Sequence, residues 1–218
     1  MKMWPPTVRG CRDLKKKNTR AVYEGAASVQ WVDDRTLRIA VLLSAHIIFL
    51  SAGALRILRG ERGHLLRSNA PWSIQYYPPL VWIPFVVAYF VPATVPLAFE
   101  LRLVGLAVAV ASALFAAWAM WSLGRGYGIR MDLFTGHRLV TRGPYRFVRH
   151  PMYLGIVAFH AGATLALESL LLLVVTLVYV VPFTLMRIAA EEKVLRDGFG
   201  EKWSAYAARV PALVPFGR

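Results

Sequence analysis

The sequence predicts an all-α membrane protein, a polytopic helix bundle of about five transmembrane segments with an amphipathic helix near its C-terminal end. Three observations support this prediction. Hydrophobic residues make up 57% of the 218 residues, above the roughly 45–50% of soluble domains. They gather into blocks near the length of about 20 residues that a helix needs to cross a bilayer. Charged residues lie between these blocks, and their formal net charge is +14.

The net charge of +14 fits either nucleic-acid binding or contact with anionic lipid. The basic residues lie in the connections between apolar blocks, which is typical of loops on the cytoplasmic side of a membrane. A nucleic-acid surface would gather them on one polar face instead. The single cysteine, Cys11, and the five scattered histidines show no metal-ligand spacing. We therefore expect membrane lipids as partners, with no nucleic acid and no metal ion.

The first 123 residues hold the N-terminal segment and three of the five predicted apolar segments. Residues 1–36 are polar and basic, and we expect them to lie at the membrane surface. Residues 37–123 hold three apolar helical segments, at about 37–58, 78–99 and 103–123. The third is rich in small residues at near-helical spacing, which lets helices approach closely. The second should be broken, tilted or re-entrant, because proline removes backbone hydrogen bonds. Its prolines are Pro78, Pro79, Pro84, Pro92 and Pro96.

Residues 124–218 form the expected catalytic region. The region begins with an arginine-rich loop, continues through apolar segments at about 154–167 and 170–186, and ends in a tail. Only Glu168 and Ser169 separate the two apolar segments, so we expect a tight helical hairpin. In the tail, apolar residues recur at steps of three and four, which predicts an amphipathic helix.

The charge distribution predicts which end of the bundle faces the cytoplasm. Residues 124–153 and 187–218 carry six basic residues each, and an excess of Lys and Arg marks cytoplasmic loops. If all five segments cross the membrane, the basic N-terminal segment lies on the side opposite the cytoplasm. If the proline-rich segment does not cross, the N-terminal segment lies on the cytoplasmic side. We expect five segments in an integral membrane protein, in the inner membrane if the source is bacterial, with the site facing the cytoplasm.

Arg187 and Glu191 are candidates for a site at the end of the last apolar segment. They are four residues apart, so on a helix they stand one above the other. A charged pair beside a bilayer is costly and by default suggests function, although the two charges could also do no more than neutralise each other. The planar guanidinium of an arginine suits recognition of a carboxylate or phosphate.

The loop before the hairpin supplies further polar and aromatic groups. His150 precedes Pro151, which restricts the histidine backbone to an extended conformation and so pre-orders the imidazole. Tyr145 and Tyr153 offer aromatic faces that can stack on an adenine or contact a sulfonium. Together with Glu191, these groups suit a zwitterionic adenosyl-amino-acid cofactor. The chain has no GxGxxG sequence, so a Rossmann dinucleotide site is not supported.

Several short motifs between about residues 125 and 216 resemble those of one group of membrane enzymes. By these motifs, the sequence resembles the isoprenylcysteine carboxyl methyltransferase and phospholipid methyltransferase superfamily. The resemblance covers less than half of the chain, and residues 1–100 carry none of it. The motifs are His137-Arg138-Leu139-Val140, Gly143-Pro144-Tyr145, Arg149-His150-Pro151-Met152-Tyr153-Leu154-Gly155, Arg187, Glu191-Glu192, Phe199-Gly200-Glu201-Lys202-Trp203, Tyr206 and Arg209-Val210-Pro211.

The resemblance implies methyl transfer from S-adenosylmethionine to a lipid-like or prenyl-cysteine-like acceptor, with carboxyl O-methylation favoured. The acceptor would enter from the bilayer and the cofactor from the cytoplasm. Arg187 and Glu191 would be the catalytic pair, with Arg187 facing the acceptor and Glu191 contacting the cofactor. The resemblance implies that the cofactor pocket is lined by His137, Arg138, Leu139, Val140, Tyr145, His150, Pro151, Met152, Tyr153 and Glu191.

Two other functions remain open from the sequence. NADPH-dependent membrane reductases of the steroid or sterol type have a similar C-terminal signature. They usually carry Asn and an acidic residue where this chain has Met152 and Ile156, and this difference favours the methyltransferase. The second alternative is a membrane scaffold without catalytic activity. The presence of both Arg187 and Glu191 near the His-Pro segment argues against a scaffold.

Overall fold

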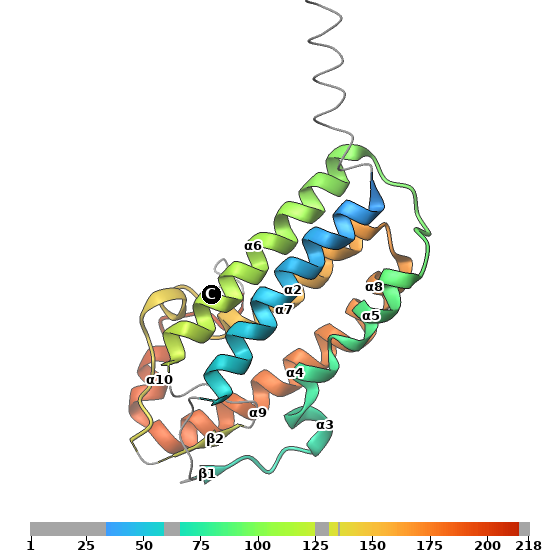
Figure 1. The fold of residues 1–218 in the computed structure, drawn as a ribbon. Helices are drawn as coiled ribbons and strands as arrows, with labels where there is room; N and C mark the ends of the chain where they lie inside the picture. The colour runs from blue at the N-terminus through green and yellow to red at the C-terminus, as the bar shows by residue number, and fades with distance from the viewer. Residues whose placement is uncertain (1–33, 59–65, 125–130, 135, 214–218) are drawn as a thin grey trace, which may run out of the picture.

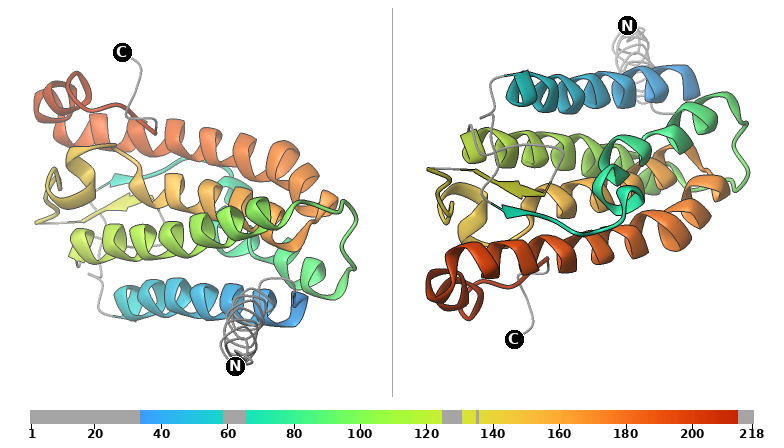
Figure 2. Two further views of the ribbon diagram at one scale, coloured as in Figure 1. Left: turned by 90° about the horizontal axis from the view of Figure 1, so that it is seen from above. Right: turned by 90° about the horizontal axis from the view of Figure 1, so that it is seen from below.

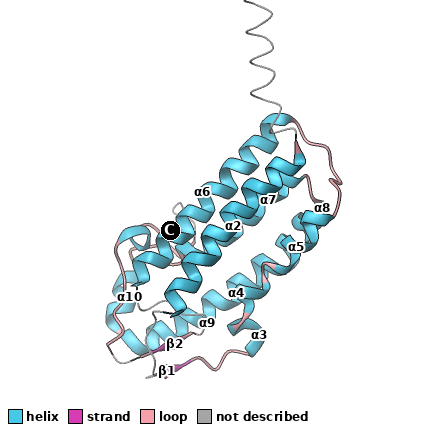
Figure 3. Cartoon of the chain, in the orientation of Figure 1, coloured by secondary structure: helices cyan, strands magenta, loops and turns pink. Residues whose placement is uncertain are grey.

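The computed structural model describes residues 34–58, 66–124, 131–134 and 136–213, and almost all of its regular structure is helical (Figures 1 and 3). Its long helices support the predicted membrane helix bundle. Described elements are α2 (Arg35–Leu58), β1 (Leu66–Arg67), α3 (Trp72–Gln75), α4 (Tyr77–Leu80), α5 (Ile83–Phe90), α6 (Phe99–Leu123), β2 (Asp132–Leu133), the 3-10 turn η2 (Gly143–Arg146), α7 (Pro151–Leu167), α8 (Leu170–Val175), the π-helical turn η3 (Thr176–Val180), α9 (Val181–Phe199) and α10 (Glu201–Ala207).

Three of the described helical stretches are long and apolar enough to cross a membrane. They are Arg35–Leu55, Phe99–Leu123 and Leu170–Phe199, the last running without a break through α8, η3 and α9. Helix α7 is shorter and apolar. The predicted segment at 78–99 is interrupted: α4 and α5 are short, and residues 91–98 carry no helix. The number of segments that fully cross the bilayer therefore stays a prediction.

The bundle is layered, with α2 and α9 on opposite sides and α6 and α7 between them (Figure 2). Helices α6 and α7 pack together more extensively than any other described pair. Glycines make this approach possible. A Cβ atom added at Gly105 would lie 2.6 Å from the Gly162 carbonyl oxygen, and one added at Gly155 would lie 2.7 Å from the Ala116 Cβ. The small residues of the third apolar segment therefore do support close helix packing.

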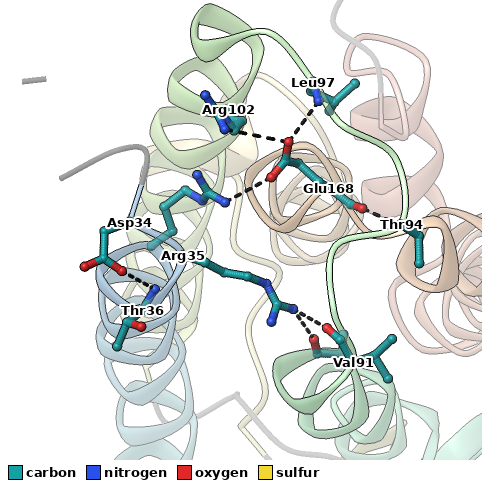
Figure 4. A network of polar contacts seen from close by, with 10 residues as sticks. Asp34, Arg35, Thr36, Val91, Thr94, Leu97, Arg102 and Glu168 are labelled. Carbon is teal, nitrogen blue, oxygen red and sulfur yellow. Dashed lines mark hydrogen bonds and ion pairs between the residues drawn. The ribbon is translucent and has the colours of Figure 1, made fainter. Parts of the chain in front are cut away.

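A polar cluster closes the end of the bundle where α7 turns into α8 (Figure 4). We call Glu168, Arg38 and Arg102 the far-end cluster. Glu168 Oε2 accepts from Arg38 Nη2 at 3.0 Å, and Glu168 Oε1 lies 3.8 Å from Arg102 Nη1. The backbone nitrogens of Leu97 and Thr94 donate to Glu168 Oε1 and to its carbonyl oxygen, at 2.8 and 2.9 Å. This cluster joins α2, α6 and the hairpin turn.

Candidate functional site

A cavity of about 870 Å³, including its open mouth, lies at the other end of α7. Every residue predicted for the site lines this cavity except Pro151, which begins α7 and is buried. The lining residues are Leu123, Met131, Asp132, Leu133, His137, Arg138, Leu139, Val140, Tyr145, Arg149, His150, Met152, Tyr153, Arg187, Glu191, Val194, Leu195, Phe199, Trp203 and Tyr206.

Arg187, Tyr153 and Glu191 form a continuous chain of hydrogen bonds, which we call the site chain. Arg187 Nε donates to the Tyr153 hydroxyl at 2.6 Å, and that hydroxyl donates to Glu191 Oε2 at 2.7 Å. Arg187 and Tyr153 are each only 2% exposed, whereas Glu191 is partly exposed at the cavity. The α7 and α9 helices thus bring a guanidinium, a phenol and a carboxylate to one wall.

Arg149, His150 and Glu192 form a second polar group on the same side. Arg149 Nη2 lies 2.8 Å and His150 Nε2 lies 3.0 Å from Glu192 Oε1. The backbone nitrogens of Arg149 and His150 donate to the carbonyls of Pro211 and Ala212 at 2.8 and 3.0 Å. These contacts hold the C-terminal tail against the loop and against α9. They bring together motif segments that are about 40 to 60 residues apart in the sequence.

Helix α10 contributes two lining residues that the sequence reasoning did not assign to the site. The Tyr206 hydroxyl donates to the Tyr145 carbonyl at 2.6 Å, and burial raises the pKa of Tyr206 to about 12. Trp203 is 2% exposed and packs edge-on against the Tyr206 ring at 5.7 Å. Both residues stand in the recognised C-terminal motif, so the signal for them was present in the sequence.

Two buried polar atoms of the cavity wall have no hydrogen-bond partner among the described residues. They are His137 Nδ1 and Trp203 Nε1. Burial lowers the pKa of His137, while the nearby Glu191 acts in the opposite direction. The imidazole is therefore neutral at pH 7 and keeps one donor and one acceptor nitrogen. Buried polar groups are normally satisfied, so unpaired atoms beside a cavity point to a bound ligand.

A short ribbon joins the cavity wall to a strand from the N-terminal half of the chain. Strand β1 pairs with β2 in an antiparallel ribbon, with Leu66 opposite Leu133 and Arg67 opposite Asp132. Leu133 and Asp132 line the cavity. A Cβ atom added at Gly198 of α9 would lie 2.1 Å from Leu133 Cδ1, so the absence of a side chain at Gly198 lets the ribbon sit directly on α9.

Comparison with known proteins agrees with this arrangement. The model of the phospholipid methyltransferase family matches residues 101–202. Protein-S-isoprenylcysteine O-methyltransferase B of Arabidopsis thaliana is 32% identical over 114 residues, which cover 51% of this chain and 58% of the relative. By these matches, the chain is similar to proteins of the isoprenylcysteine carboxyl methyltransferase and phospholipid methyltransferase superfamily.

The similar proteins differ in what their names say they methylate. Methanethiol S-methyltransferase 1 of Bradyrhizobium diazoefficiens is 44% identical over 75 residues, which cover 34% of this chain and 25% of the relative. A solved structure of the eukaryotic intramembrane Ras methyltransferase ICMT has a TM-score of 0.50 at 24% identity, covering 68% of this chain and 55% of that chain. This likeness shows a common fold. The chain spans less than two thirds of each of these relatives.

The family match covers every residue that lines the cavity except Trp203 and Tyr206. Residues 101–202 include most of the loop, the hairpin and the site chain. The ribbon strand β1 and helices α3 to α5 precede the match. In the described part of the chain, no group of three or more His, Cys, Asp or Glu side chains is placed to hold a metal ion.

Proposed function

We propose that this chain transfers the methyl group of S-adenosylmethionine to a lipid-like or prenyl-cysteine-like acceptor, with carboxyl O-methylation favoured. The observation that supports this most strongly is the convergence of the loop motif and the Arg187–Glu191 motif on one cavity. Similarity to the methyltransferases of this superfamily supports the reaction class.

The residues of the cavity fit the cofactor in charge and chemical character. Glu191 gives a carboxylate for cationic groups, and Arg138 gives a guanidinium group for a carboxylate. Aromatic and apolar side chains provide faces for an adenine ring. His137 Nδ1 and Trp203 Nε1 are buried polar atoms that a ligand can satisfy.

The bound cofactor would supply a methyl group already activated on a sulfonium, so the reaction needs no covalent enzyme intermediate. The protein's contribution is then to hold two reactants in line and to exclude water. Tyr153 fixes the spacing between Arg187 and Glu191, because its hydroxyl bonds to both side chains. Arg187 would orient an acceptor carboxylate through its charge.

The same proposal includes the orientation in the membrane. The arginine-rich loop and the tail meet at the cavity end of the bundle. An excess of basic residues favours the cytoplasmic side. The cofactor would enter there, and an apolar acceptor would reach the site laterally from the bilayer.

The test is methyl transfer by the purified protein in lipid nanodiscs, using S-adenosylmethionine labelled in the methyl group. Acceptors are the host's total lipid extract, a farnesylated cysteine, methanethiol and phosphatidylethanolamine. We expect label in an apolar acceptor, and strongest labelling of a free carboxylate. Full transfer by both Arg187→Ala and Glu191→Ala would contradict the site assignment. Hydride transfer from NADPH without methyl transfer would support the reductase instead.

A further inference from the structure

Two adjacent prolines at the start of α4 cannot donate the hydrogen bonds that would join α3 and α4 into one helix. A proline has no amide hydrogen, so in a helix the carbonyl four residues earlier loses its hydrogen bond. For Pro78 and Pro79 these are the carbonyls of Ile74 and Gln75, the last residues of α3. The backbone bends between α3 and α4 at Tyr76, where φ is −98° and ψ is 7°.

The guanidinium of Arg187 occupies this position. Its Nη1 atom donates to the Ile74 carbonyl at 2.8 Å and also to the Gln75 carbonyl. Its Nε atom donates in another direction, to the Tyr153 hydroxyl. A charged side chain that is only 2% exposed needs such partners, because burial of an unpaired charge is very costly. The carbonyls freed by the proline pair are therefore part of what makes a buried Arg187 possible.

A second set of contacts fixes α4 against the helix that carries Arg187. The Tyr77 hydroxyl donates to the Val180 carbonyl at 2.9 Å and lies 2.6 Å from Thr184 Oγ1. Positions 180, 184 and 187 are spaced by four and three residues, so they share one helical face. Val180 ends the π-helical turn η3, and π-helical turns occur frequently at functional sites.

We propose that the Tyr77-Pro78-Pro79 segment is a positioning element for Arg187. This inference rests on the proposed methyl transfer and assigns part of its geometry to residues that precede the superfamily match at 101–202. With Nη1 held by two carbonyls and Nε held by Tyr153, the plane of the guanidinium is fixed before any acceptor binds. Pre-ordering of this kind lowers the cost of reaching the reactive geometry.

The experiment restores the missing amide hydrogens with Pro78→Ala and Pro79→Ala. Each new N–H competes with Arg187 for the carbonyl four residues earlier and favours a continuous helix over the bend at Tyr76. Pro84→Ala is the matched control, since it removes a proline from α5, where the carbonyl four residues earlier is that of Leu80. Thermal unfolding in nanodiscs confirms that each variant is folded.

Two readouts separate positioning from a purely structural role. The first is kinetic: we expect kcat to fall about tenfold or more in both variants, while the Kd for S-adenosylmethionine stays within about twofold of the wild type. The second needs no reaction. In protein labelled with ¹⁵N-arginine, the Arg187 Nε–H signal, identified by its loss in Arg187→Lys, should be protected from solvent exchange in the wild type. It should exchange faster in both proline variants and remain protected in Pro84→Ala.

Unchanged kcat together with unchanged Arg187 exchange in folded Pro78→Ala and Pro79→Ala would overturn the inference. An equal loss of kcat in Pro84→Ala would also overturn it. If neither variant folds, Tyr77→Phe serves instead, with the same expected loss of kcat and of Nε–H protection. A wild-type protein that transfers no methyl group would contradict the proposed function, whereas the exchange measurement would still decide whether the proline pair holds Arg187.

Discussion

The two ends of α7 carry the same kinds of buried charge but differ in what surrounds them. Helix α7 has 17 residues, so its ends are about 25 Å apart. At the far-end cluster, both carboxylate oxygens of Glu168 and its carbonyl are bonded to protein groups. At the other end, the site chain borders a cavity, and His137 Nδ1 and Trp203 Nε1 lack partners in the described part of the chain.

This difference shows why a buried Arg–Glu contact is not by itself a sign of function. An ion pair whose bonds are all made within the protein joins helices and fixes their register. A set of charges beside a cavity can act on a ligand. By this criterion we assign a structural role to Glu168 and propose a functional role for Glu191, although both lie near the end of an apolar segment.

Loss of the far-end carboxylate should give the largest effect, and it should be on stability. Glu168→Ala leaves the buried Arg38 without its carboxylate, and breaking such a pair costs about 3–5 kcal/mol of unfolding free energy. Unfolding by dodecyl sulfate in mixed micelles measures this loss. The methyl-transfer rate per folded molecule should stay within about twofold of the wild type; a large loss of kcat without loss of stability would assign a functional role to the far end.

Loss of the site carboxylate should show the opposite pattern. Glu191→Gln keeps the size of the side chain but removes its charge, so we expect kcat/KM to fall about 100-fold. The exposed Glu201→Gln, on α10, is a control for loss of an acidic charge in the same region. Initial rates with labelled S-adenosylmethionine measure both. Equal rates for the two variants would remove Glu191 from the site.

Close packing between the two ends should tolerate no added side chain. Gly162→Val introduces a side chain where even a Cβ atom would lie 2.6 Å from the Ala109 nitrogen, and overpacking costs about 1–3 kcal/mol. Ala161→Val, at the exposed neighbouring position of α7, should change the unfolding free energy by less than about 0.5 kcal/mol. The same destabilisation by both substitutions would contradict the close α6–α7 contact.

The smallest effect concerns pH at the cavity. Burial lowers the pKa of His137 below its usual value of 6.5. The unfolded chain therefore binds a proton at His137 more readily than the folded protein does. The free energy of unfolding is therefore highest, as far as His137 is concerned, above pH 6.5, where the imidazole is neutral in both states. It decreases as the pH falls below 6.5. His137→Gln should make the unfolding midpoint less sensitive to pH between about 7 and 5. An unchanged pH dependence would show that His137 contributes nothing to it.

Sequence patterns predicted the features that repeat or cluster along the chain. Blocks of apolar residues predicted the helical bundle, and the small residues of 103–123 predicted its tightest contact. The spacing of Arg187 and Glu191, with the loop motif, predicted residues that the structure places around one cavity.

Features that depend on backbone atoms or on very short elements gave no such signal. The carbonyls of Ile74 and Gln75 are more than 100 residues from Arg187 in sequence, and a carbonyl is common to every residue type. The strands β1 and β2 have two residues each, too few for an alternating pattern. The partners of Glu168 come from three separate segments, so its role depended on the packing of the whole bundle.

Calorimetric titration of S-adenosylmethionine into three proteins in nanodiscs tests the functional role of the cavity end most directly. The wild type and Glu168→Gln should bind with the same Kd, and Glu191→Gln should bind about tenfold or more weakly. Equal affinity of all three proteins, or weaker binding by Glu168→Gln alone, would contradict the assignment of the cofactor to this cavity.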